Sequence, residues 1–277
     1  MNKIKYAFSL AVLSLAMAAC SNDTDPGQSL GDNNGKGIPF TATISMAGSA
    51  TRSVLTEDTE KGVITAAWAE GDALALVYKV GSVTKVTKAV MTALDDDKSA
   101  VITATLEEGV TEGTAVTLLY PYDAVIVNPE ESDYGKLDFY KLIEQKGTLT
   151  DIADRFDFCQ GSGKLTLAGT ASLTADVKME SQIAIWKLSL TDGTNPLEAT
   201  QLNIATDEEA IMAMVLLDTG TASEFYVAVP ALNNGLINMA AATATGDYVY
   251  SKTGVTIEAG KYYQSTVTME LDTCVLP

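Results

Sequence analysis

The stretch Ile38-Pro39-Phe40-Thr41-Ala42-Thr43-Ile44-Ser45-Met46 decides the fold class of this chain. Its apolar residues occupy every second position, and the residues between them are threonine or serine. Because successive side chains of a β-strand point to opposite faces, this period of two is typical of a strand with one buried face. We therefore expect a strand over residues 38–46, with a core-facing row formed by Phe40, Ala42, Ile44 and Met46.

The same alternation recurs along the chain, in residues 74–80, 101–106, 173–179, 184–190 and 263–271. Turn signals separate these runs, for example Asp192-Gly193-Thr194-Asn195-Pro196 and Asn233-Asn234-Gly235. Many short strands at this spacing indicate an all-β protein of the sandwich or barrel type. The length fits two β-sandwich domains, residues 38–170 and 171–277. One short helix is expected near residues 150–158, capped by Thr150 or Asp151.

Residues 1–19 have the features of a signal peptide. Two lysines precede an apolar run from Tyr6 to Ala16, and this run is too short to span a bilayer core of about 30 Å. The following Leu15-Ala16-Met17-Ala18-Ala19-Cys20 resembles a bacterial lipobox, in which the cysteine becomes the lipidated first residue. We therefore expect lipidation of Cys20, and Ser21 fits sorting to the outer membrane. Asn22-Asp23-Thr24-Asp25 resembles the short acidic signal that sends Bacteroidetes lipoproteins to the cell surface.

Residues 20–37 are polar and glycine-rich, and Leu30 is their only large apolar side chain, so a flexible tether is expected. Removal of residues 1–19 leaves 16 basic and 36 acidic residues, a net charge of −20. Such a charge excludes general attraction to nucleic acid or to anionic lipid. It suits a soluble surface protein.

The sequence contains no histidine, which removes the usual catalytic triads and the commonest transition-metal ligand. Asp95-Asp96-Asp97 lacks the spaced ligands of a calcium loop and is interpreted as a solvated turn. We therefore expect no enzyme activity, no cofactor and no metal. Trp68 and Trp186 are interpreted as core anchors rather than sugar-stacking platforms. Cys159 and Cys274 can form a disulfide in an exported compartment or stay as buried thiols.

Several motifs resemble the fimbrillin-like proteins, which are subunits and accessory proteins of type V pili in Bacteroidales. They are, in chain order, Thr51-Arg52-Ser53, the Trp-x-x-Gly-Asp pattern of residues 68–72, Tyr120-Pro121-Tyr122, Gln145-Lys146-Gly147-Thr148-Leu149, Asp157-Phe158 and Ala259-Gly260-Lys261-Tyr262-Tyr263. The similarity covers roughly residues 38–271. It implies a transthyretin-like β-sandwich in each domain and a place in a fimbrium at the cell surface.

The resemblance also implies a mechanism of assembly. An arginine-specific protease removes the first strand of a surface lipoprotein, and the vacated groove accepts a strand from another pilus subunit. Only Arg52 and Arg155 are arginines, and a cut between Arg52 and Ser53 would release the strand of residues 38–46. Six residues follow Leu271, too few for an additional long donor strand. Either the last strand itself swings out, or the chain is a tip or accessory subunit that only accepts a strand.

A second hypothesis is a surface lipoprotein that stays monomeric and binds glycans. An exposed row of aromatic side chains on one sandwich face would favour this second hypothesis, since the fold by itself does not settle the function. The host or bacterial receptor is not identified by the sequence under either hypothesis.

Overall fold

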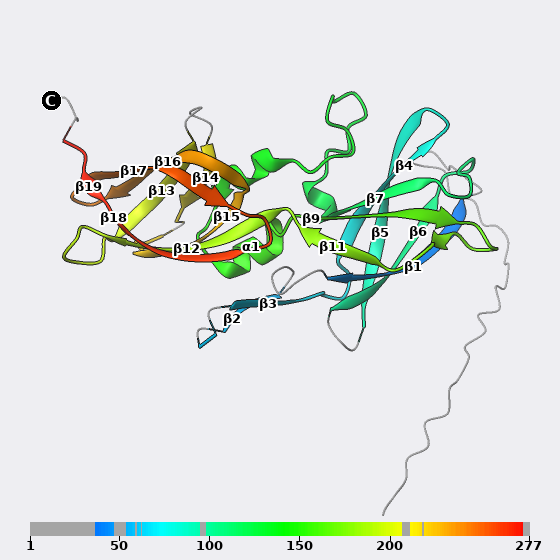
Figure 1. The fold of residues 1–277 in the computed structure, drawn as a ribbon, viewed down its shortest axis with the longest axis horizontal. Coiled ribbons are helices and arrows are strands. Elements are labelled where there is room, and N and C mark those ends of the chain that lie inside the picture. Colours follow the sequence, from blue (N-terminus) through cyan, green and yellow to red (C-terminus); the bar gives the residue numbers. More distant parts are fainter. Residues whose placement is uncertain are drawn as a thin grey trace, which may run out of the picture. The chain divides into compact units, whose positions relative to one another are not determined.

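A computed structural model describes residues 37–46, 54–58, 60–61, 63–94, 98–206, 211–217 and 219–273. Nearly all of the regular structure in these residues is β (Figure 1). The all-β fold class predicted from the period of two is therefore confirmed. The division into two domains at residue 170 and the transthyretin-like form of each stay predictions, and residues 36–277 cluster as one unit.

Eight strands form the sheet of the N-terminal half. They are β1 Ile38–Met46, β4 Ala73–Val80, β5 Val83–Ala93, β6 Ser99–Leu106, β7 Ala115–Tyr120, β9 Cys159–Thr166, β10 Ser172–Leu173 and β11 Val177–Ser181. Their order is β10-β9-β11-β1-β6-β5-β4-β7, and β7 also pairs with β9. That additional pairing closes β1, β6, β5, β4, β7, β9 and β11 into a ring around one core.

A glycine permits the closure of this ring at β9. A Cβ atom on Gly161 would lie 2.5 Å from Val177 Cγ1 and 2.8 Å from Met179 Sδ of β11. A side chain at position 161 would force these neighbours to shift, so glycine allows β9 to approach β11 as closely as it does.

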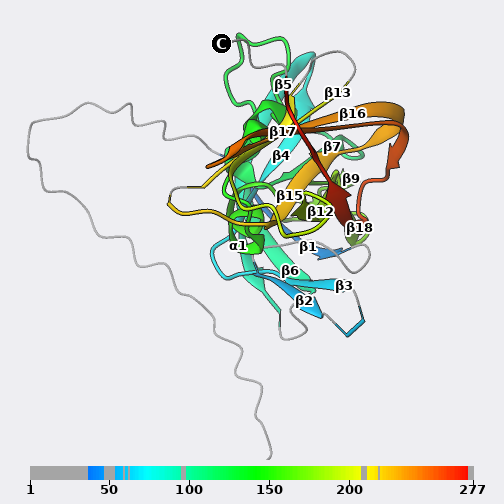
Figure 2. The ribbon, with the colours of Figure 1, turned by 90° about the vertical axis from the view of Figure 1, so that its left-hand side faces the viewer.

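Two sheets form the C-terminal half. Their strands are β8 Glu144–Gln145, β12 Ile183–Thr191, β13 Ala199–Thr206, β14 Ile211–Leu216, β15 Glu224–Pro230, β16 Leu232–Thr243, β17 Gly246–Ile257, β18 Tyr262–Thr268 and β19 Glu270–Leu271. One sheet has the order β15-β12-β18 and the other β19-β17-β16-β13-β14-β8. Figure 2 shows β13, β16 and β17 as one layer and β12, β15 and β18 as the layer facing it. A second buried core lies between them, with Leu188, Val227 and Ile237 among its members.

A separate hairpin and three short helices complete the described structure. The hairpin is β2 Val54–Asp58 with β3 Val63–Ala67. The helices are η1 Tyr122–Ala124, η2 Phe139–Ile143 and α1 Leu149–Arg155. The helix expected near residues 150–158 exists, but its cap is neither Thr150 nor Asp151. The Thr148 side chain caps it by accepting a hydrogen bond from the Asp151 backbone N–H at 3.1 Å.

Candidate functional site

Strand β1 lies between two neighbours in the ring. It pairs antiparallel with β6 over residues 38–45 and parallel with β11 over residues 44–46. Backbone hydrogen bonds between Thr41 N and Ala171 O, and between Ala171 N and Pro39 O, hold its other end on the β11 side. Loss of β1 alone would therefore open the ring and leave two unpaired strand edges, one on β6 and one on β11.

The side chains of β1 alternate between core and surface as the sequence predicts. Phe40, Ala42 and Ile44 are buried, with 1%, 5% and 0% of their surfaces exposed, and Met46 packs against the same core. Thr41, on the opposite face, is exposed. The row forms one wall of the N-terminal core. That this strand is removable stays a prediction.

The structure describes only some of the other predicted site residues. Cys20, Arg52 and Ser53 lie outside the described residues, as do Cys274 and residues 95–97. Arg155, the other arginine, lies in α1, where its guanidinium bonds the Asp151 carboxylate at 2.6 Å and the Glu144 carbonyl at 3.0 Å. Cys159 is buried, and its thiol lies 3.8 Å from the Asp157 carboxylate.

The Trp-x-x-Gly-Asp motif has a structural role. Trp68 has 3% of its surface exposed and packs edge-on against Tyr120, with 5.3 Å between ring centroids. The Asp72 carboxylate accepts hydrogen bonds from Ala69 N at 3.0 Å and from the Tyr120 hydroxyl at 3.3 Å. Trp186 has 9% of its surface exposed, in the C-terminal core. The interpretation of both tryptophans as core anchors is confirmed.

A carboxylate cluster connects the β2–β3 hairpin with the C-terminal half. Glu57 on β2 accepts hydrogen bonds from the hydroxyls of Tyr226 at 2.5 Å and Tyr262 at 2.6 Å. The Lys187 ammonium lies 3.3 Å from the same carboxylate. These partners come from β15, β18 and β12, the three strands of one sheet. Glu57 and Lys187 are largely buried, with 10% and 18% of their side chains exposed.

These contacts shift the ionisation of the cluster. The Tyr226 and Tyr262 hydroxyls are the largest influences on Glu57; with Lys187 they hold the pKa of its carboxyl below the ordinary range, against the opposing effect of burial. Burial, followed by the hydrogen bond to Glu57, raises the pKa of Tyr262 and that of Tyr226. At neutral pH the cluster therefore contains a charged Glu57, two neutral tyrosines and a charged Lys187.

We expect this cluster to make stability depend on pH in the acid range. Because the folded-state pKa of Glu57 lies below its unfolded value of about 4.3, its contribution is present above that pH and is lost as the pH falls through the lowered pKa. Glu57→Gln should lower the free energy of unfolding at neutral pH by about 1.5–3 kcal/mol, a difference that shrinks in acid. Urea unfolding of both proteins across this range measures the difference. Glu60→Gln, an exposed change on the same hairpin, should show none.

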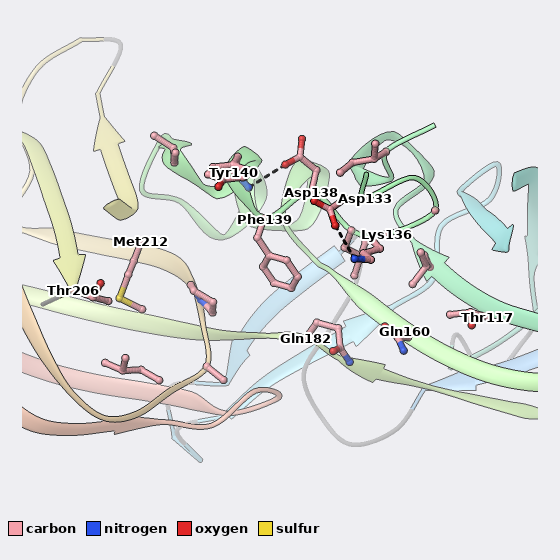
Figure 3. A pocket seen from close by; sticks show the side chains of 18 residues that line it. Thr117, Asp133, Lys136, Asp138, Phe139, Tyr140, Gln160, Gln182, Thr206 and Met212 are labelled. Carbon is pink, nitrogen blue, oxygen red and sulfur yellow. Dashed lines mark hydrogen bonds and ion pairs between the residues drawn. The ribbon is translucent and has the colours of Figure 1, made fainter. Parts of the chain in front are cut away.

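A cleft of about 730 Å³ lies between the outer side of the N-terminal ring and the C-terminal sheets. Figure 3 shows Phe139 on η2 pointing across it toward Gln182, with Thr206 and Met212 on one side and Gln160 and Thr117 on the other. Tyr140 has 83% of its surface exposed at the rim. A cleft of this size with aromatic and amide groups is within the range that small-molecule sites occupy.

The described residues contain no cluster of three or more metal-ligating side chains and no helix long and apolar enough to cross a membrane.

Comparison with known proteins gives structural likenesses only. No protein-family model matches the chain, and no curated protein matches it. Among solved structures, the chain is similar to Bacteroidales fimbrial proteins. These neighbours are of the same class of protein as the one that the sequence motifs resemble.

Three of these structures show the extent of the likeness. A fimbrial protein from Bacteroides ovatus is 12% identical, with a TM-score of 0.39, and the match covers 85% of this chain and 49% of that one. A candidate cell adhesion protein from Bacteroides fragilis is 13% identical, with a TM-score of 0.44, covering 86% and 95%. The tip fimbrial protein Mfa3 from Porphyromonas gingivalis, truncated at its C-terminus, is 11% identical, with a TM-score of 0.38, covering 85% and 96%.

The chain thus spans about half the length of the first of these proteins. Since all three TM-scores are below 0.5, we base the function on this chain's own residues.

The Glu57 cluster was not predicted from the sequence. Leu55 and Glu57 are two residues apart and share a strand face, which indicates a half-buried carboxylate. The partners of Glu57 lie 130 to 205 residues further along the chain, so no local pattern connects them.

Proposed function

We propose that this protein is a subunit of a surface pilus that joins other subunits by exchange of strand β1. In this proposal the chain is first anchored to the outer membrane through the lipid on Cys20. A protease then cuts between Arg52 and Ser53, β1 leaves, and a strand of another subunit takes its place. We also propose that the chain catalyses no reaction, in keeping with the absence of histidine from its sequence.

The observation that supports this proposal most is the position of β1 in a closed ring. Its removal would leave a groove with an unpaired backbone edge on each side and with pockets for the side chains of alternate residues. Backbone hydrogen bonds to both edges would give an incoming strand affinity, and the pockets would fix its register. Full burial of a Phe or Ile side chain is worth about 1.5–3 kcal/mol, so an empty groove is strongly disfavoured.

A strand with a matching pattern occurs in this chain. Residues 263–269 read Tyr-Gln-Ser-Thr-Val-Thr-Met, and residues 40–46 read Phe-Thr-Ala-Thr-Ile-Ser-Met. Both present an aromatic, a small, a β-branched and a methionine side chain at alternate positions. Both strands also pair in parallel with one neighbour, β1 with β11 and β18 with β12. The β18 segment of a second copy is thus a suitable donor.

A binding experiment tests this fit. A peptide of residues 262–270 should bind the chain cut after Arg52 and depleted of its first strand. The same peptide with the substitution Val267→Asp should bind at least about tenfold more weakly. Val267 corresponds to Ile44 in the matched pattern, so the aspartate carboxylate would enter the buried Ile44 pocket. Equal binding of the two peptides would remove β18 as the donor.

The lipid anchor has its own test. Cys20→Ser should abolish incorporation of a radiolabelled fatty acid and leave an unprocessed precursor, because no other residue replaces the lipobox cysteine. Label that persists in the variant would contradict both the anchor and the outer-membrane location. A Cys159→Ser variant, which changes a buried thiol outside the signal peptide sequence, is the matched control.

The second candidate function is binding of a glycan by a monomeric lipoprotein. The exposed ring of Tyr140 beside the cleft of about 730 Å³ is the observation that favours it. Negative-stain images of cells that carry the protein separate the two functions. Filaments that contain this chain support the pilus subunit, and dispersed single molecules support the glycan-binding protein.

A further inference from the structure

The β2–β3 hairpin belongs to one half of the molecule by sequence and contacts the other half in space. Along the chain it lies between β1 and β4, which are both strands of the N-terminal ring. In the sheet topology it is a separate two-stranded unit that joins none of the three larger sheets (Figure 1). The position of the hairpin therefore depends on its side-chain contacts with the rest of the chain.

The hairpin takes part in an apolar cluster that lies on the outer face of the sheet β15-β12-β18 and also includes Ala75 and Leu119 of the N-terminal ring. Ile64, with 1% of its surface exposed, and Leu55 belong to a buried cluster that includes Ile183, Ile185 and Ala228 of that sheet. Helix α1 lies against β2 as well. The hairpin thus covers the face of the sheet β15-β12-β18 that points away from the C-terminal core.

Glu57 adds polar contacts at the same place. It lies opposite Ile64 in the hairpin, so its carboxylate emerges from the apolar face. There it meets two tyrosine hydroxyls and one ammonium group, contributed by three adjacent strands. In the register of that sheet Lys187 is opposite Tyr226, which brings both onto one face. Hydrogen bonds to a charged and largely buried group are among the stronger contacts in a protein.

We infer that the β2–β3 hairpin is a clamp: Glu57 holds it on the sheet β15-β12-β18, so that the hairpin stays in place when β1 is cut away. The inference rests on the proposed function for the departure of β1. In this inference Glu57 is a positioning residue, because it holds in place the hairpin that becomes the N-terminal segment of the protein after cleavage. Only strand β1 is then lost.

The clamp is needed because a cut after Arg52 removes one of the two chain connections of the hairpin. A two-stranded hairpin is marginally stable by itself in water. With only the connection to β4 left, it would fray and follow the departing strand unless side-chain contacts retained it. The apolar face supplies affinity for the sheet, and the carboxylate supplies a specific position on it.

Peptide-resolved hydrogen exchange tests the clamp. The full chain, Glu57→Gln and Glu60→Gln are each compared before and after treatment with an arginine-specific protease. In the wild-type chain, exchange across residues 54–67 should change less than about threefold after cleavage. In Glu57→Gln it should rise by about tenfold or more, because loss of the charged hydrogen bonds raises the population of the open hairpin. Glu60→Gln removes the same charge from an exposed position and should behave as wild type.

Two results would overturn the inference. One is loss of hairpin protection in the wild-type chain as soon as it is cut, and the other is equal exchange in Glu57→Gln and Glu60→Gln. If Glu57→Gln does not fold, Tyr262→Phe, which removes a single hydroxyl from the cluster, replaces it with the same two criteria. If the protease does not cut after Arg52, the proposed strand release is wrong, and exchange in the uncut variants still decides whether Glu57 holds the hairpin.

Discussion

An arginine-specific protease is expected to cut the folded chain once, after Arg52, and to leave a body that begins at Ser53. Arg52 follows Ala47-Gly48-Ser49-Ala50-Thr51, a stretch of small residues of the kind that proteases cut in loops. Arg155 should resist, because it lies in α1 and bonds both Asp151 and a backbone carbonyl. The mass of the product after limited digestion measures the outcome.

The corresponding variant should lose assembly altogether. Arg52→Ala is expected to stay uncut and to remain outside filaments, since its groove is still occupied by its own β1. Arg155→Lys, which removes the other protease site and keeps the charge near Asp151, should be cut and assembled as wild type. Filaments that contain the Arg52→Ala chain at the wild-type level would show that strand exchange is not primed at this site.

The second large effect is expected from the core-facing row of β1. Ile44→Ala should lower the free energy of unfolding by about 2–5 kcal/mol, because it leaves a cavity at a position that is 0% exposed. Thr41→Ala on the opposite, exposed face should change it by less than about 0.5 kcal/mol. Urea unfolding of the uncut proteins measures both values. Similar effects of the two substitutions would mean that β1 does not fill the core in solution.

The strand that matters most could be predicted because its pattern is local. Phe40, Ala42 and Ile44 are separated by polar residues, and the alternation alone identifies both the strand and its buried face. Strand β17 is harder to predict because most of its side chains are exposed, so no apolar row marks it. The cap of α1 was misplaced by two or three residues, because Thr148, Thr150 and Asp151 are all residues that commonly cap helices.

The arrangement of the strands could not be predicted, because pairing depends on contacts between distant segments. β8, at residues 144–145, pairs with β14 of the C-terminal sheet, whereas β11, at residues 177–181, pairs with β1 of the N-terminal ring. The chain therefore passes between the halves more than once. The domain boundary at residue 170 was placed from turn-like residues, and such local signals contain no information on long-range strand pairing. The Glu57 cluster was missed for the same physical reason.

The most direct measurement of the central claim is N-terminal sequencing of this protein recovered from filaments on intact cells. If β1 is removed and replaced by a strand of another subunit, the sequence should begin at Ser53, and residues 20–52 should be absent from the filament. A chain in the filament that still carries the lipidated Cys20 and the strand of residues 38–46 would contradict strand exchange.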